Sequence, residues 1–388
     1  MFAKIGRAFS ASPRAERPRL SVLVTSFTYR CFANWEPVFH RLRDQGHRVH
    51  TALFPRLSDP DHARLLRLPF DNVLRCPIDA QFRTVGQSEE TVLARLAGWA
   101  ADEEPDLVWL CTFHQGPERL LRQRLASLPF PPLIVGLQHG IWHDWQLFEA
   151  WADRFDLLGA FGRFFFDQCS PALARRMVVM GLPKLDAVAA PPRGGPIRRI
   201  LFAAQNEPSV AKMETLLRAV AADLDAKIVV RPHPEHREAF RPLFGGFAVN
   251  SPDEPLRAAL DSADAMITTG STAAVEGLAA GLRVAVLPCQ GGTVYEQAGI
   301  VASSLGAADV VAVLRRYDDP AFHAGIRRFL AAATGAADGG RTDMALAAID
   351  RLVARRRSHG ARPSRAGILH ELREFGSRRR HGERGRAN

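Results

Sequence analysis

Two series of alternating strand and helix patterns, separated by the segment APPRGGP at residues 190–196, constrain the fold of this chain most strongly. Short apolar runs such as LSVLVT (20–25) and RVAVLP (283–288) have the length and composition of strands that are buried on both faces of a parallel sheet. Helical patterns separate these runs in each series. A Pro- and Gly-rich segment between two such series marks a linker.

The pattern predicts an α/β fold with two Rossmann-like domains facing a central cleft, and 388 residues suffice for two domains. The predicted N-terminal domain spans residues 20–189, the linker 190–197 and the C-terminal domain 198–355. A basic arm (1–19) precedes them. A basic tail (356–388), which we expect to be disordered, follows them.

The net charge of +10 is concentrated at the two ends of the chain. Residues 351–388 contain twelve Arg and three Glu, and residues 1–20 contain four Arg, one Lys and one Glu, so the remainder is slightly acidic. Nucleic-acid-binding proteins carry their basic surface within the fold, and we therefore expect no nucleic-acid partner. The basic ends are either solvated tails or peripheral contacts with an anionic membrane, at about 1 kcal/mol per basic residue.

Neither a membrane span nor a secretory signal is apparent in the sequence. No run approaches the ~18 apolar residues that a span requires, and the N-terminus lacks the apolar core of a signal peptide. The five cysteines are scattered, without C-x-x-C spacing, which is typical of reduced thiols. These features predict a cytoplasmic protein, either free or peripheral at the inner face of the cytoplasmic membrane.

Polar residues follow a predicted strand in the second series at KIVVRPHPEH, residues 227–236. Arg231 can pair with a phosphate group, and His233, between two prolines, can donate to a phosphate oxygen or shuttle a proton. The alternative interpretation is an ordinary Pro-rich turn with surface histidines. Ligands of open parallel sheets bind at the carboxyl ends of strands, which favours the functional interpretation.

A second candidate in the same series is the turn Gly270-Ser271-Thr272, which follows AMITT and opens a helix rich in Ala and Gly. Free backbone N–H groups and the two hydroxyls can bind phosphate. Glu276 lies one turn further, where its carboxylate can reach a ribose hydroxyl. The alternative interpretation is a plain Ser/Thr cap with a solvated glutamate.

The first series offers a polar group at the end of LIVGL, where Gln138, His139 and Gly140 follow the predicted strand. The glycine permits a close backbone approach, and the imidazole can project into the cleft. His114, after the preceding strand, and Asp144 are further candidates for the acceptor side. A single histidine is more often structural than catalytic, so both interpretations stay open.

The order and spacing of these motifs resemble a known superfamily over roughly residues 105–300. RPHP (231–234) followed by TTGSTAAVEGLAAGLRVAVLP (268–288) resembles the donor half of GT-B transferases of bacterial envelope assembly. These include the CDP-glycerol glycerophosphotransferases and the capsule and lipopolysaccharide glycosyltransferases. QHG (138–140) resembles a first-domain motif of the former. GLPKLDAV (181–188) resembles a segment of these enzymes and of the UDP-N-acetylglucosamine 2-epimerases.

The resemblance implies a GT-B enzyme that uses a nucleotide-activated sugar or polyol donor and a glycan or lipid-linked acceptor to build a cell-surface polysaccharide or glycolipid. It implies that His139 is a base or positioning group, and that Arg231 and His233 bind the donor diphosphate. It further implies that Ser271 and Thr272 contact phosphate and that Glu276 contacts the ribose. No metal and no cofactor other than the donor substrate are implied, because basic groups can neutralise the leaving group.

Two alternatives use the same fold. A UDP-N-acetylglucosamine 2-epimerase would turn over a nucleotide sugar without an acceptor, but its first-domain carboxylates and its His-Arg-Arg-Glu segment are not found in this sequence. A non-catalytic protein of polysaccharide assembly or export would bind a nucleotide without turnover or not at all. Fold alone does not separate these functions.

Overall fold

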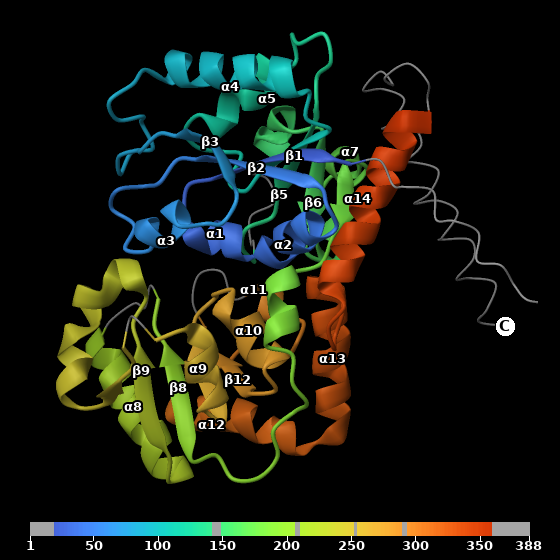
Figure 1. Ribbon diagram of the computed structural model, residues 1–388. Helices are drawn as coiled ribbons and strands as arrows, with labels where there is room; N and C mark the ends of the chain where they lie inside the picture. Colours follow the sequence, from blue (N-terminus) through green and yellow to red (C-terminus); the bar gives the residue numbers. More distant parts are fainter. Residues whose placement is uncertain (1–18, 142–148, 206–209, 252–253, 289–292, 359–388) are drawn as a thin grey trace, which may run out of the picture.

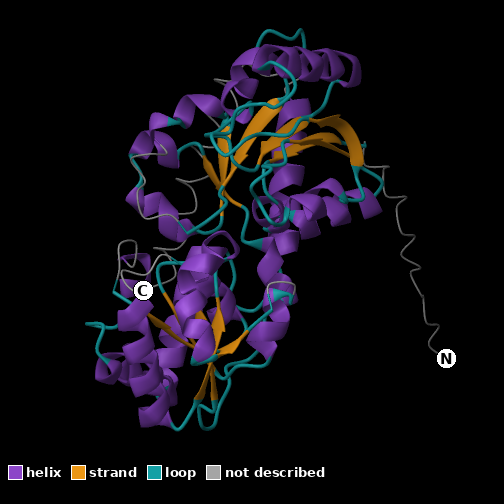
Figure 2. Ribbon diagram, turned by 90° about the vertical axis from the view of Figure 1, so that its left-hand side faces the viewer, coloured by secondary structure: helices purple, strands orange, loops and turns teal. Residues whose placement is uncertain are grey.

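The computed structural model describes residues 19–141, 149–205, 210–251, 254–288 and 293–358. The chain forms two α/β domains, each built around one parallel sheet (Figure 1). The sheets appear in Figure 2 with helices on both sides. None of the helices within these ranges has a stretch that is long and apolar enough to cross a membrane.

The first domain contains a seven-stranded parallel sheet of order β3-β2-β1-β4-β5-β6-β7. Its strands are β1 (Ser21–Ser26), β2 (Arg48–Leu53), β3 (Asp71–Arg75), β4 (Leu107–Leu110), β5 (Leu133–Leu137), β6 (Leu157–Ala160) and β7 (Met177–Val179). The apolar runs of β1, β4 and β5 are buried along their whole length, as expected for strands covered on both faces. The sequence analysis missed β3, whose residues are largely polar and half-exposed.

Helices cover both faces of this sheet. They are α1 (Tyr29–Ala33), α2 (Glu36–Asp44), α3 (His62–Leu66), α4 (Glu89–Glu103), α5 (Glu118–Leu125) and α7 (Pro171–Ala174), with the short 3-10 helices η1 (Ala152–Arg154), η2 (Arg163–Gln168) and η3 (Pro183–Ala187). Local sequence explains their limits: Ser88 accepts a hydrogen bond from the Thr91 N–H at the start of α4, and α2 buries Val38, Phe39 and Leu42 on one face.

The second domain contains a five-stranded parallel sheet of order β10-β9-β8-β11-β12. Its strands are β8 (Arg199–Ala203), β9 (Lys227–Arg231), β10 (Ala248–Val249), β11 (Ala265–Thr268) and β12 (Arg283–Val286). Its helical elements are α8 (Val210–Leu224), η4 (Pro234–Gly245), α9 (Leu256–Asp261), α10 (Ala273–Ala279), α11 (Thr293–Glu296), α12 (Ala307–Arg315), η5 (Arg316–Asp318) and α13 (Pro320–Thr334). Both sheets therefore reverse their strand order once, between β1 and β4 and between β8 and β11, and ligands of open sheets bind at such points.

The last helix, α14 (Arg341–Ser358), returns to the first domain, whereas the sequence analysis assigned its residues to the second. It packs on α2, η3 and β7, and Figure 1 shows it in red beside the upper domain. The fully buried Arg341 lies 3.4 Å from Asp186, which also accepts the Thr342 N–H at 2.8 Å. Before it, α13 packs on η2, where a Cβ on Gly162 would meet the Ala332 carbonyl. The chain therefore passes between the domains twice, once between η3 and β8 and once between α13 and α14.

Three other expectations concern the ends and the thiols. Residues 1–18 of the basic arm and residues 359–388 of the basic tail lie outside the described residues. The first three residues of the tail, 356–358, belong to α14. Cys31, Cys76, Cys111 and Cys169 are free thiols, and the fifth cysteine lies outside the described ranges.

Candidate active site at the junction of the two domains

Three polar contacts join the domains near the carboxyl ends of their strands, and each uses a residue that the sequence analysis assigned to the donor site. The contacts are Ile141 N–H to Thr272 Oγ1 at 3.1 Å, Arg30 Nη1 to His233 Nε2 at 3.2 Å, and Lys184 Nζ to Glu276 Oε1 at 2.6 Å. Residues far apart in the sequence therefore meet at one place, which we call the junction. Figure 1 shows α1 and α2 of the upper domain facing α10 and β9 of the lower one.

His233 leaves β9 at its carboxyl end and meets Arg30, which lies in α1 directly after β1. A guanidinium only donates hydrogen bonds, so Nε2 of His233 is the acceptor and the neutral ring carries its proton on Nδ1 in this arrangement. Arg30 also lies 3.8 Å from the carboxylate of Asp59, which is buried. Asp59 thereby helps to fix a guanidinium that reaches across the junction.

Arg231 is held inside the second domain. Its guanidinium donates to Oδ1 of Asn250 and, at 3.0 Å, to the carbonyl of Glu254. Burial lowers the pKa of Arg231, and the neighbouring carboxylates of Glu254 and Glu276 oppose this shift. Glu276 therefore acts on Arg231 electrostatically, and the hydrogen bonds of the Arg231 guanidinium hold the loop that follows β10.

The turn before α10 has a structural role in addition to the predicted one. Ser271 Oγ accepts the Ala273 N–H at 3.1 Å, as in an ordinary cap, and the Ser271 carbonyl accepts the hydroxyl of the buried Tyr295 at 2.5 Å. The hydroxyl of Thr272 accepts the Ile141 N–H of the first domain and does not cap its own helix, α10. Gly270 is half-buried at the carboxyl end of β11.

The first-domain side of the junction is held by Asn34 and Trp35, which the sequence analysis did not single out. Asn34 Nδ2 donates to the His139 carbonyl at 3.0 Å, and Trp35 Nε1 donates to the Gln138 carbonyl at 3.2 Å. The Gln138 side chain is fully buried and bonds the Gly140 carbonyl and the Phe161 N–H. The side chain of Gln138 therefore holds the loop after β5 from inside the domain.

His139 and His114, two candidates for the acceptor side, lie together at the carboxyl ends of neighbouring strands. Their rings are nearly parallel with centroids 5.2 Å apart, and Trp151 stacks on His114 at 4.5 Å. Burial lowers the pKa of His139 to about 3 and that of His114 to about 4. Both imidazoles are consequently neutral at physiological pH. The third acceptor-side candidate in this region, Asp144, lies outside the described residues.

Glu118 is a buried carboxylate beneath this group that sequence reasoning missed. Its Oε2 accepts the N–H groups of Thr112 and Phe113 at 2.9 and 2.6 Å, and burial raises its pKa to about 7. Phe113 has a positive φ of 30°, and its ring contacts those of His114 and His139. Glu118 therefore stabilises the strained turn that carries His114. The sequence contained one signal for this role, since Glu118 is an acidic residue at the first position of a helix that follows the loop after β4.

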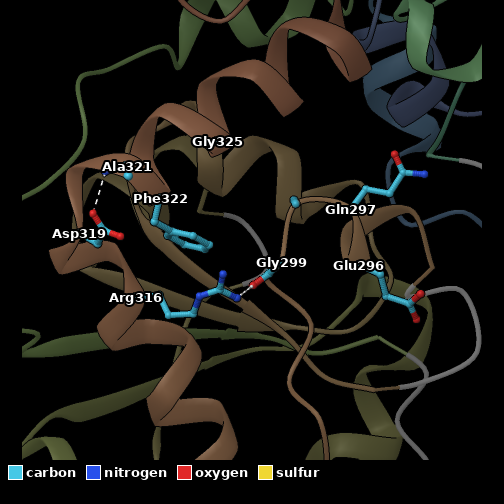
Figure 3. Close-up of a pocket in the computed structure, with 9 residues that line it drawn as sticks. Glu296, Gln297, Gly299, Arg316, Asp319, Ala321, Phe322 and Gly325 are labelled. Carbon is cyan, nitrogen blue, oxygen red and sulfur yellow. Dashed lines mark hydrogen bonds between the residues drawn. The ribbon is translucent and has the colours of Figure 1, made fainter.

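A separate cavity lies on the second domain, between α11 and α13 (Figure 3). Arg316 crosses it, donates to the Gly299 carbonyl at 2.6 Å and lies over the ring of Phe322. None of the predicted site residues lines this cavity, so the junction remains the candidate site. Across the described ranges, no three His, Cys, Asp or Glu side chains come together as a metal-ligand set.

Comparison with known proteins agrees with the GT-B architecture. The model of the family described as "Putative glycosyltransferase (DUF6716)" matches residues 75–323. No curated protein sequence matches the chain.

Solved structures with the same fold include epimerases and glycosyltransferases. A putative UDP-N-acetylglucosamine 2-epimerase from Listeria monocytogenes superposes with a TM-score of 0.63 at 15% identity, over 90% of this chain and 98% of that one. The UDP-GlcNAc 2-epimerase from Neisseria meningitidis bound to UDP-GlcNAc gives 0.57 at 12%, over 85% and 100%. The glycosyltransferase of kitacinnamycin gives 0.58 at 17%, over 86% and 99%. At these identities the likeness establishes the fold, and the chain has the GT-B fold.

Proposed function

We propose, because the chain belongs to the family described as "Putative glycosyltransferase (DUF6716)", that it transfers a sugar from a nucleotide-activated donor to a hydroxyl of a glycan or lipid-linked acceptor. The observation that carries the proposal is the junction. His233, which follows β9, and Thr272 and Glu276, at the start of α10, each meet a first-domain side chain or backbone group there. Catalysis between two substrates requires that both be held at one place, and this is the place where both domains contribute.

On the second-domain side, the proposed donor site contains Arg231, His233, Gly270, Ser271, Thr272 and Glu276. His233 follows β9 and Thr272 follows β11 at the start of α10, so both lie at the carboxyl edge of the sheet, with β8 between their strands. Their hydrogen-bonding groups suit a diphosphate, and the carboxylate of Glu276 suits the ribose hydroxyls. The cationic groups of this region would stabilise the charge of the leaving diphosphate, so we propose that no metal or further cofactor takes part.

On the first-domain side, His139 is proposed as the base or positioning group for the acceptor. The acceptor oxygen would form a bond to the anomeric carbon, while the bond from that carbon to the donor phosphate breaks. The hydroxyl proton would pass to His139, whose low pKa keeps it neutral and able to accept. His114 would support this ring by stacking. The low pKa also means that protonated His139 is unstable unless a negative charge lies nearby.

The pathway is a finer proposal, namely the assembly of a cell-surface polysaccharide or glycolipid on the cytoplasmic side of the membrane. It is supported by the resemblance of RPHP (231–234) and QHG (138–140) to envelope transferases and by the basic ends of the chain. These ends would attract the enzyme to anionic lipid, where lipid-linked acceptors are found. The epimerase structures support the alternative function only through their fold, and an epimerase would consume the donor without an acceptor.

The proposal is tested first by thermal unfolding of the purified protein with UDP, CMP, CDP, GDP, ADP and TDP. A ligand that binds only the folded state stabilises it by about 2.7 kcal/mol at a hundredfold excess over Kd. We expect one base to raise the melting temperature clearly above the others. If none of the six does so while inorganic phosphate is also without effect, the protein lacks the proposed donor site.

A further inference from the structure

Lys184 is a first-domain cation at the junction to which no role has yet been given. It lies on η3, and its Nζ is 2.6 Å from Oε1 of Glu276 on α10. Only 24% of the Lys184 side chain and 13% of the Glu276 side chain are exposed, so this ion pair is largely removed from water. Removing one partner of such a pair is costly, because it leaves an uncompensated charge where little water can solvate it.

The backbone of Lys184 is fixed from two sides. Its N–H donates to the carbonyl of Asn34 at 3.2 Å, and the Asn34 side chain holds the carbonyl of His139 at 3.0 Å. Two residues further, Asp186 pairs with the buried Arg341. The position of Lys184 is therefore tied both to the proposed base and to α14. A flexible surface lysine would not be held in this way.

The other junction cations have carboxylate or carbonyl partners within their own domain. Arg231 is bound by Asn250 and Glu254 of the second domain, and Arg30 lies beside Asp59 of the first. Lys184 differs, because its carboxylate partner is across the junction and is a group that we assign to the donor. When Glu276 binds the ribose hydroxyls of the donor, its carboxylate neutralises the charge of Lys184 less completely.

The anion that is linked to a donor ribose is the diphosphate. We propose that Lys184 binds the diphosphate of the nucleotide donor and neutralises it as it leaves, with Glu276 acting as its partner only when the donor is absent. This inference rests on the proposed function. It adds a first-domain residue to the donor site that we propose on the second domain. The ammonium group of a lysine is a compact charge on a flexible stem, so it can stay close to the diphosphate while the bond between sugar and phosphate breaks.

The test compares ligands that differ only in their phosphates. Kd values of the nucleoside, the nucleoside monophosphate and the nucleoside diphosphate, with the base chosen by the thermal panel, are measured by calorimetry for wild type and Lys184→Met. A charge-assisted contact contributes about 1.5–3 kcal/mol, so we expect the diphosphate to bind about 10- to 100-fold more weakly to the variant. We expect the nucleoside to bind within about twofold of wild type, which is the precision of such a comparison.

Two control variants make each outcome informative. Lys227→Met removes an exposed lysine at the amino end of β9, at the edge of the sheet opposite the junction, and should leave all Kd values unchanged. Glu276→Gln should weaken the nucleoside and the diphosphate alike, because both carry the ribose. If Lys184→Met raises the Kd of every ligand by the same factor, or of none, Lys184 does not bind the diphosphate. Its role is then only the ion pair with Glu276 between the domains. If wild type binds none of the ligands, the proposed function fails instead.

Discussion

The two sides of the junction are built from different chemistry. The first-domain side consists mainly of neutral groups that burial keeps neutral: Gln138, His139 and His114. The second-domain side contains charged groups, among them Arg231 and Glu276, and the carboxylate of Glu276 acts electrostatically on Arg231. Lys184 and Arg30 are the charged exceptions on the first-domain side. Lys184 pairs with Glu276 and Arg30 contacts His233, both of the second domain.

This difference fits the two substrates that we propose. An acceptor hydroxyl is uncharged, and a neutral imidazole that can accept its proton is the matching group. A nucleoside diphosphate is an anion and needs cations, which a protein can keep near its interior only when carboxylates pair with them in the absence of ligand. The comparison predicts that substitutions on the second-domain side act mainly on donor binding and turnover. Those on the first-domain side should act on stability and on the protonation of the imidazoles.

The largest expected effect is the loss of turnover in His233→Ala. A group that positions phosphate or a proton in the transition state contributes about 10²–10⁴-fold in rate. We therefore expect kcat/KM for release of the nucleoside diphosphate to fall by that order, with an unchanged melting temperature. His40→Ala, on α2 outside the junction, is the matched control. Full activity in His233→Ala would remove His233 from the proposed site.

A large effect on stability is expected for Glu118→Ala. The substitution leaves the N–H groups of Thr112 and Phe113 buried without an acceptor, at about 1–3 kcal/mol each. We expect the free energy of unfolding to fall by about 2–4 kcal/mol, as measured by denaturant unfolding followed with a first-domain probe. Glu118→Gln keeps one acceptor oxygen and should lose far less. Equal losses in the two variants would show that the negative charge, and not the hydrogen bonds, stabilises this turn.

An intermediate effect is expected from pH. In the unfolded chain His139 and His114 titrate near 6.5, whereas burial lowers their pKa values to about 3 and about 4 in the folded protein. Between pH 6.5 and pH 4 the unfolded state therefore binds protons that the folded state does not, so stability falls as pH falls through this window. Glu118 acts in the opposite direction, because its pKa is raised from 4.5 to about 7.

The histidine and glutamate contributions can be separated by substitution. Thermal unfolding at pH 7 and pH 5 should show a smaller loss of stability for His139→Gln than for wild type. Glu118→Gln should show a larger loss, because the opposing carboxyl group is gone. An unchanged pH dependence in His139→Gln would mean that this imidazole is not held neutral by burial.

The smallest expected effect is that of Thr272→Val, which keeps the shape of the side chain and removes the acceptor for the Ile141 N–H. One such hydrogen bond contributes about 1 kcal/mol, so the Ile141 amide should exchange with deuterium about fivefold faster. Thr272→Ser retains the hydroxyl and is the control. Unchanged exchange in the valine variant would show that the amide has another acceptor or is protected by burial alone.

The strands and the candidate groups at their ends were largely predictable, because apolar runs of strand length are explicit in the sequence. LSVLVT (20–25) became β1, and AMITT with the following glycine became β11 and its turn. Strand β3 was missed because its half-exposed residues give no such run. Asn34 and Trp35 were missed because a hydrogen bond to a carbonyl more than 100 residues away leaves no local pattern.

By itself, the sequence determined that this chain has two parallel-sheet domains and that polar residues follow several of the strands. Local periodicity and Pro- or Gly-rich breaks contain that information. Only the tertiary structure decided which of these residues meet: His233 with Arg30, Glu276 with Lys184, and His139 with His114. It also decided which groups are neutral, because the pKa of an imidazole or carboxyl depends on burial and on the charges around it, and neither can be read from the neighbours in the chain.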